Sequence, residues 1–237
     1  MNRLVRADLK RIIAKPGMFV VVILMALIVL LKSPNDTAAD QMEFYKFFFN
    51  VLGLTFVMIP IYLSVYTDEI KSGIMVSVIG MGMSRKKVVK SKLKDSFILL
   101  LISYTLLFLV ALYKNNSSDL AVTPRQNAFL FLFCMYCVIR GIGVIALSSL
   151  VLFLTMSATG GMLVLLVGGI AAAGALQPLQ EYLGMPVYDF SYIGLLDQSF
   201  AQFQAGNIGF TIIPALIYLM IVININIATF NRKEMDL

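Results

Sequence analysis

Apolar runs bounded by polar residues decide what this chain can fold into. They lie at about residues 18–31, 47–66, 97–113, 128–154, 161–176 and 210–230. A segment that crosses a bilayer must satisfy its own backbone hydrogen bonds, which a helix does. The sequence is 59% hydrophobic and only 14% charged, whereas soluble domains are about 25% charged. We therefore expect an all-α membrane protein with six transmembrane helices in a single transmembrane domain, residues 1–237.

The first apolar run is short for a membrane crossing. A helix over residues 18–31 rises only about 21 Å, against a hydrocarbon core of about 30 Å. Lys15 and Lys32 flank the run, and their long side chains extend its reach to both headgroup layers.

The N-terminal residues 2–15 predict an amphipathic helix. Apolar and basic residues fall on opposite sides of its helical wheel. The apolar side holds Leu4, Val5, Leu9, Ile12 and Ile13, and the basic side holds Arg3, Arg6 and Lys10. Such a helix lies flat in the membrane interface and contacts membrane lipids. The alternative is a solvated basic tail.

The charges between the apolar runs predict an orientation. The interval 67–95 carries seven basic residues and three acidic ones, and short loops rich in Lys and Arg stay in the cytoplasm. The interval 177–208 has three acids and no bases. We read it as an extracellular amphipathic interval with short helices before the last span. Six spans then leave both the N- and C-termini cytoplasmic.

The cytoplasmic interval is more than a connector. Ile70, Ile74, Met75, Val78 and Ile79 give it an apolar helical face. Gly73 permits a bend before this short helix, residues 80–82 form a turn, and Ser84 is a fair N-cap for the next helix. An apolar face on a cytoplasmic loop favours contact with another protein. The alternative is a helix that rests on lipid headgroups.

Polar and small residues inside the spans complete the candidate sites. Arg140 falls near the middle of the fourth run, where an unpaired guanidinium costs about 2.5–3.5 kcal/mol, so it should face the bundle or a water-filled cavity. It either meets an acidic group on a cargo or is structural, by pairing with helix-end carbonyls or lying shallower. We include Asn50 with it as a candidate for the translocation pathway. Small residues that allow close helix packing follow in the fifth run: Gly168, Gly169, Ala172 and Ala173.

The sequence lacks the residues that several classes of function require. The chain has no histidine and no G-x-x-x-x-G-K-[ST] phosphate loop. The usual general base and this route to ATP hydrolysis are therefore absent, and we expect no catalytic, cofactor or metal site and no enzyme activity in this chain. The net charge of +6 flanks the spans instead of forming a soluble basic face, so we expect no nucleic-acid partner.

A resemblance follows from the interval 67–95. The pattern Glu69-x-x-x-Gly73, an apolar stretch to Ile79, then Ser84-Arg85 and Lys92 before a span resembles the permeases of type-2 ABC exporters. In that family a cytoplasmic stem on the second span leads to a coupling helix, and a P-x-S-R turn opens the third span. Here Gly82 stands where the family usually has proline.

The resemblance implies a permease subunit in the plasma membrane of a bacterium. Two copies, either identical or close paralogues, would bind two copies of a separate ABC ATPase subunit, which holds ATP and Mg²⁺. The cargo would be a hydrophobic or amphipathic substrate such as a peptide, as in bacteriocin-immunity and phenol-soluble modulin exporters. The residues that would form the interface with the ATPase are Glu69, Gly73, Ile74, Met75, Val78, Ile79, Ser84 and Arg85.

Two other function classes stay open from the sequence. One is a secondary transporter or channel without an ATPase, which would use paired acids or an ion relay within its spans. The other is a membrane adaptor that transports nothing. Copurification with an ATPase would distinguish the ABC permease from both of these classes.

Overall fold

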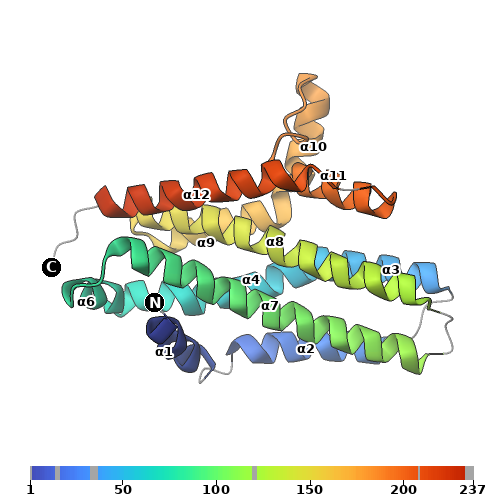
Figure 1. The fold of residues 1–237 in the computed structure, drawn as a ribbon, viewed down its shortest axis with the longest axis horizontal. Coiled ribbons are helices and arrows are strands. Elements are labelled where there is room, and N and C mark those ends of the chain that lie inside the picture. Colours follow the sequence, from blue (N-terminus) through green and yellow to red (C-terminus); the bar gives the residue numbers. More distant parts are fainter. Residues whose placement is uncertain (1, 14–16, 33–36, 119–121, 208, 233–237) are drawn as a thin grey trace.

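The computed structural model describes residues 2–13, 17–32, 37–118, 122–207 and 209–232 (Figure 1). All regular elements within these ranges are helices. The helices are α1 (Asn2–Ile13), α2 (Gly17–Leu31), α3 (Ala38–Phe47), α4 (Leu54–Tyr62), α5 (Asp68–Lys71), α6 (Ile74–Gly80), α7 (Arg85–Ser117), α8 (Pro124–Thr155), α9 (Ala158–Leu166), α10 (Ala172–Leu183), α11 (Tyr192–Gln204) and α12 (Ile212–Arg232), with π-helical turns η1 (Phe48–Gly53), η2 (Leu63–Thr67) and η3 (Val167–Ala171). The all-α class expected from the sequence is confirmed.

Four helices are long and apolar enough to cross a membrane, which indicates a membrane protein. They cover Ala38–Ile70, Arg85–Ser117, Pro124–Thr155 and Ile212–Arg232. Two shorter apolar helices follow the first and fifth apolar runs of the sequence: Gly17–Leu31 matches the run 18–31 closely, whereas Ala158–Gly169 overlaps only the first part of the run 161–176. The end of the first is anchored, because Lys114 Nζ on α7 donates to the Leu30 carbonyl over 2.8 Å.

The second long helix begins nine residues before the apolar run that predicts it. Thr37 caps it by accepting a hydrogen bond from the Asp40 amide, so the polar stretch that follows Thr37 is helical. From Ala38 the chain runs through α3, η1, α4, η2 and α5 without a break. The third long helix likewise unites the basic stem from Arg85 and the apolar run that follows it.

Helix α8 lies at the centre of the bundle. It packs against α7, α9 and α12, with α11 also against it, and α2 lies on the far side of α7 (Figure 1). Large aromatic side chains fill the interior, among them Tyr62, Tyr66, Tyr104, Phe49 and Phe153. Helix α10 stands out from the bundle in Figure 1.

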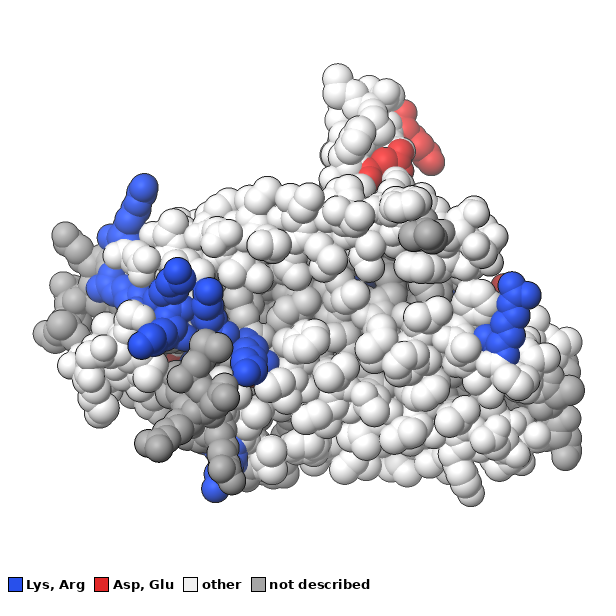
Figure 2. All heavy atoms as spheres, viewed as in Figure 1, with Lys and Arg blue, Asp and Glu red and all other residues white. Residues whose placement is uncertain are grey.

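Charge divides the surface along the bundle. Figure 2 shows Lys and Arg gathered over the end that carries α1, α6 and the start of α7, while side chains without charge cover the middle. We call this the basic end and the other the opposite end. The exposed basic residues of α7 there are Lys86, Lys87, Lys90 and Lys94.

Candidate functional site

The helix that the sequence predicts between the second and third long helices is present as α6. Gly73 has φ +67, a left-handed conformation suited to glycine, and it makes the bend between α5 and α6. Gly82, at φ +88, turns the chain after α6, and Ser84 occupies the N-cap of α7 without a side-chain capping bond. In Figure 1, α6 lies at the basic end, close to α1.

A buried charge cluster holds the start of α6. Lys92 Nζ on α7 lies 2.5 Å from Glu69 Oε1 on α5 and 2.6 Å from Asp8 Oδ2 on α1. Arg11 on α1 also pairs with Glu69. Lys92 is 3% exposed and Glu69 1%, so both charges depend on these partners for compensation. The cluster joins three helices at the point where α6 leaves the bundle.

Asp95 lies one turn beyond Lys92 on α7 and is fully buried. Neither of its carboxylate oxygens accepts a hydrogen bond within the part of the chain that the structure describes. The basic end therefore encloses one carboxyl group that the ion-pair cluster does not satisfy.

Arg85 holds the segment that follows α6. Its Nη1 donates to the carbonyls of Phe230, over 3.1 Å, and Asn231, over 3.0 Å, at the end of α12. Its guanidinium also lies 6.0 Å from the Phe230 ring centre. Cations near a helix C-terminus are favoured by the helix dipole. The connection from α6 to α7 is thereby tied to the last helix of the bundle.

The expected interface residues of α6 separate into two groups. Met75 is buried against the charge cluster, and Val78 and Ile79 are half-buried against the core. Ile74 is exposed, as is Met81 just after the helix, at 84%. The structure places the Glu69 carboxylate inside the chain, where it positions α6 from within. Among the side chains of this segment that the structure describes, the exposed large apolar ones are thus Ile74 and Met81.

Arg140 lies inside the bundle, as its charge requires. Arg140 Nη1 donates to Asn50 Oδ1 over 2.8 Å and to the Tyr136 hydroxyl over 3.0 Å, and it lies 4.0 Å from Asp197 Oδ1. Tyr136 and Tyr188 each donate to the Asp197 carboxylate. The two residues chosen from the sequence as pathway candidates, Arg140 and Asn50, thus meet in one network.

A cavity of about 260 Å³ borders this network, lined in part by Asn50, Arg140 and Asp197. Arg140 Nε is buried without a hydrogen-bond partner among the described residues. Burial and the hydrogen bond to Asp197 raise the pKa of Tyr188, so its phenol stays protonated and remains a donor. The arrangement joins α11 to α8 and to the π-helical turn η1 through polar groups alone.

The glycines chosen for helix packing face other helices. A Cβ on Gly168 would lie 3.3 Å from Val144 Cγ1 on α8, and one on Gly169 would lie 2.9 Å from Met58 Cε on α4. Ala172 and Ala173 fall in α10, and their side chains lie outside what the structure describes. Closer approaches occur at Gly161, where a Cβ would meet the Tyr62 hydroxyl at 1.8 Å, and at Gly143, where it would lie 2.1 Å from the Tyr192 ring.

Sequence reasoning missed Asp8, Arg11 and Asp95 at the basic end, and Tyr136, Tyr188 and Asp197 around Arg140. Asp8 and Arg11 carried a detectable signal, since they sit one turn apart on a helix predicted to be amphipathic. Asp197 carried a detectable signal as well, since it is the acidic residue in the amphipathic segment that forms α11.

Comparisons of this chain with protein-family models, with curated proteins and with solved structures find no match. The functional assignment therefore depends on the geometry described above.

Proposed function

We propose that this chain is the membrane permease subunit of an ATP-driven ABC exporter, with α6 as the coupling helix that docks on a separate ATPase. One observation carries the proposal: α6 and the residue that follows it expose Ile74 and Met81, while ion pairs and hydrogen bonds of the flanking segments hold both ends of α6 to the bundle. A helix held in this way moves together with α5, α7 and α12. Force applied to α6 therefore reaches three of the long helices.

The proposal includes six spans, with α2 and α9–η3 as the two shorter ones. Both shorter helices are apolar, and Lys32 beside α2 and the packing of α9 on α8 favour their place in the bilayer. The basic end then faces the cytoplasm of a bacterial cell with both termini, since Lys and Arg gather there (Figure 2).

The cargo, in this proposal, is a hydrophobic or amphipathic peptide, and Arg140 lies on its path. Support comes from the cavity beside Arg140 and Asn50, where Arg140 keeps a buried Nε without a partner among the described residues. When no cargo is bound, the Asp197 carboxylate is the acidic partner of the Arg140 guanidinium. An acidic group on a peptide would exchange with Asp197, which would loosen α11 from α8.

A second copy of the chain completes the proposed assembly. Helix α10 and the turn after it leave the bundle and expose large apolar side chains, including Tyr182 at 88%, Met185 and Phe190. Exposed apolar surface of this kind favours burial against another subunit.

The decisive experiment is coexpression of the chain with candidate ABC ATPase subunits, beginning with any that a neighbouring reading frame encodes. Ile74→Asp combined with Met81→Asp should abolish copurification of the ATPase, because it places two charges on the exposed apolar side chains of this segment. Ile74→Leu combined with Met81→Leu is the matched control, since it changes the same two positions and keeps them apolar. An ATPase that copurifies with the double variant at wild-type stoichiometry would overturn the proposal.

A secondary transporter is the second candidate, favoured by Asp8, Glu69 and Asp95 around Lys92. Buried ionisable groups between the helices of a membrane protein often mark proton or ion relays. Uptake or release driven by a pH gradient in vesicles that hold this chain alone would support this candidate, and a strict need for ATP and the ATPase would reject it.

A further inference from the structure

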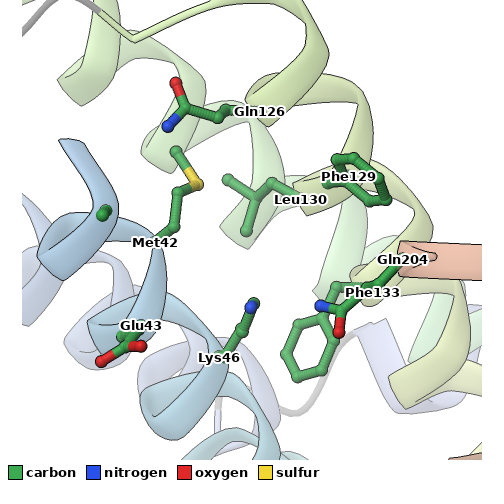
Figure 3. Close-up of a pocket in the computed structure, with 9 residues that line it drawn as sticks. Met42, Glu43, Lys46, Gln126, Phe129, Leu130, Phe133 and Gln204 are labelled. Atoms are coloured by element: carbon green, nitrogen blue, oxygen red, sulfur yellow. The ribbon is translucent and has the colours of Figure 1, made fainter. Parts of the chain in front are cut away.

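A second cavity opens at the opposite end of the bundle, between α3, α8 and the end of α11, with a volume of about 360 Å³. Figure 3 shows the Lys46 ammonium directed into the hollow between α3 and α8. The carboxylate of Glu43, one turn earlier on α3, is turned away from that hollow (Figure 3). We call this cavity the outer pocket. The charge that enters it is therefore positive.

The Lys46 ammonium has no carboxylate to neutralise it. Lys46 is half-buried, and no ion pair or hydrogen bond joins its side chain to another residue in the described ranges. The other acid that precedes it on α3, Asp40, accepts a hydrogen bond from the Thr37 hydroxyl over 2.7 Å. A half-buried ammonium in this state favours an anion from outside the chain, because its desolvation is otherwise uncompensated.

Arg125 brings a second positive charge to the same cavity. Its guanidinium lies 5.8 Å from the centre of the Phe129 ring, and Phe129 lines the outer pocket. Arg125 forms no ion pair with the part of the chain that the structure describes. Helices α3 and α8 thus each bring a cation without a carboxylate partner to this cavity. The charge that complements both is negative.

The inner wall of the outer pocket is apolar. Met42, Leu130 and Phe133 line it and are buried in the core. Contact with such a wall favours an apolar group, whereas a small hydrated ion gains nothing from it. The volume is near the lower limit of pockets that take small ligands. The wall and the cations together indicate a small ligand that has both an anionic group and an apolar body.

We propose that the outer pocket binds an amphiphilic carboxylate, with its anionic group on Lys46 and its apolar chain against Leu130 and Phe133. A single negative charge suffices, because one ammonium enters the hollow (Figure 3). A fatty acid of medium chain length is the simplest ligand of this class. The site does not rest on the exporter function, because none of its residues lies on α6 or bonds to Arg140.

The walls of the outer pocket are held in place without a ligand. Tyr45, beside Lys46 on α3, donates to Asn115 Oδ1 on α7 over 3.1 Å, and Asn115 donates to Asn127 Oδ1 on α8 over 2.8 Å. These bonds join the two helices between which the pocket lies. A preformed site loses less conformational freedom on binding.

The test is photoaffinity labelling of the full chain in maltoside micelles with a diazirine analogue of decanoate, followed by mass spectrometry of the labelled peptides. Label is expected on α3 and α8. Lys46→Met should lower this labelling by about tenfold or more, because it removes a charge-assisted contact. Lys46→Arg keeps the cation and should keep most of the labelling. Lys94→Met is the matched control, since it removes a cation at an exposed position on α7.

A second variant closes the pocket and leaves every charge in place. Ala39 is exposed and lines the outer pocket, so Ala39→Phe should fill part of the space without disturbing the core. It should lower labelling of α3 and α8 to a similar degree. Labelling at the wild-type level in Lys46→Met or in Ala39→Phe would overturn the proposal.

Unlabelled competitors identify what the outer pocket recognises. Decanol keeps the chain without the charge, and acetate keeps the charge without the chain. Each should compete at least about tenfold less well than decanoate, because each loses one of the two contacts. Competition by decanol or acetate equal to that of decanoate would overturn the proposal. Stronger competition by an amphipathic peptide with a free C-terminal carboxylate than by decanoate would overturn the choice of ligand.

Discussion

Lys92 on α7 and Glu69 on α5 form a buried ion pair, with 2.5 Å between Nζ and Oε1, at the root of α6. Both side chains are almost fully shielded from solvent, and Asp8 and Arg11 on α1 complete the cluster. The short N-terminal helix is thus bonded to the base of the second and third long helices.

Removal of Lys92 should destabilise the protein strongly. Lys92→Met leaves the buried Glu69 and Asp8 carboxylates with the part-exposed Arg11 as their remaining cation, and breaking a buried pair from one side costs about 3–5 kcal/mol. Thermal unfolding in detergent, followed by circular dichroism, should show a lowered midpoint. Lys94→Met, at an exposed position on the same helix, should leave the midpoint unchanged. Equal midpoints for the two variants would contradict the role of the cluster.

Arg140 and Asp197 should be energetically coupled. Arg140→Gln and Asp197→Asn each leave one buried or half-buried partner without its opposite charge, while the double variant removes both. Residues in one hydrogen-bond network show coupling of about 0.5–3 kcal/mol, so the double variant should lose less stability than the sum of the single ones. Strict additivity in a double-mutant cycle on unfolding free energy would show that the two groups act independently.

Gly161 should tolerate no side chain. A Cβ there would lie 1.8 Å from the Tyr62 hydroxyl and 3.0 Å from the Ser148 carbonyl, so Gly161→Ala forces α9 away from α4 and α8. Overpacking of this kind costs about 1–3 kcal/mol. Gly160→Ala is the control, because its nearest contact of 3.5 Å is ordinary. The unfolding midpoint should fall for Gly161→Ala alone, and a fall of similar size in both would reject the steric reason.

Arg85 should protect the end of α12. Arg85→Gln removes the charged donor to the Phe230 and Asn231 carbonyls, and hydrogen bonds to charged groups contribute about 1.5–3 kcal/mol. Hydrogen exchange measured by mass spectrometry should therefore accelerate in the last turn of α12. Lys86→Gln changes an exposed neighbour and should leave that exchange rate as it is. Unchanged protection in Arg85→Gln would show that other contacts hold this helix end.

The all-helical class and the α6 segment were within reach of the sequence. Hydropathy marks the apolar helices because the bilayer permits few other structures, and Gly73 and Gly82 mark the two turns because both need positive φ. Arg140 was predicted to face the interior for a similar reason, since the energetic penalty of exposing its charge to lipid leaves few places for it.

The partners of these residues were beyond sequence reasoning. Glu69 was placed at the ATPase interface by the resemblance to the permease family, and nothing in the sequence indicated that Lys92 and Arg11 enclose its carboxylate. Asp197 falls in an interval whose acidity served only to assign a side of the membrane, and nothing local relates it to Arg140. Pairings of this kind depend on how distant helices pack, which a single sequence does not record.

The π-helical turn at Phe48–Gly53 has a consequence for how the second long helix can move. Its wider backbone leaves the Phe49 carbonyl accepting from both the Leu54 amide and the Tyr104 hydroxyl, so its bonding pattern differs from that of the regular turns on either side. Asn50 sits within it. If this π-helical turn shifted by one residue along the helix, Asn50 would rotate about the helix axis. Its hydrogen bond with Arg140 would then break, while the two ends of the helix kept their contacts. A local rotation at this π-helical turn would thus release the contact between Asn50 and Arg140 without bending the helix.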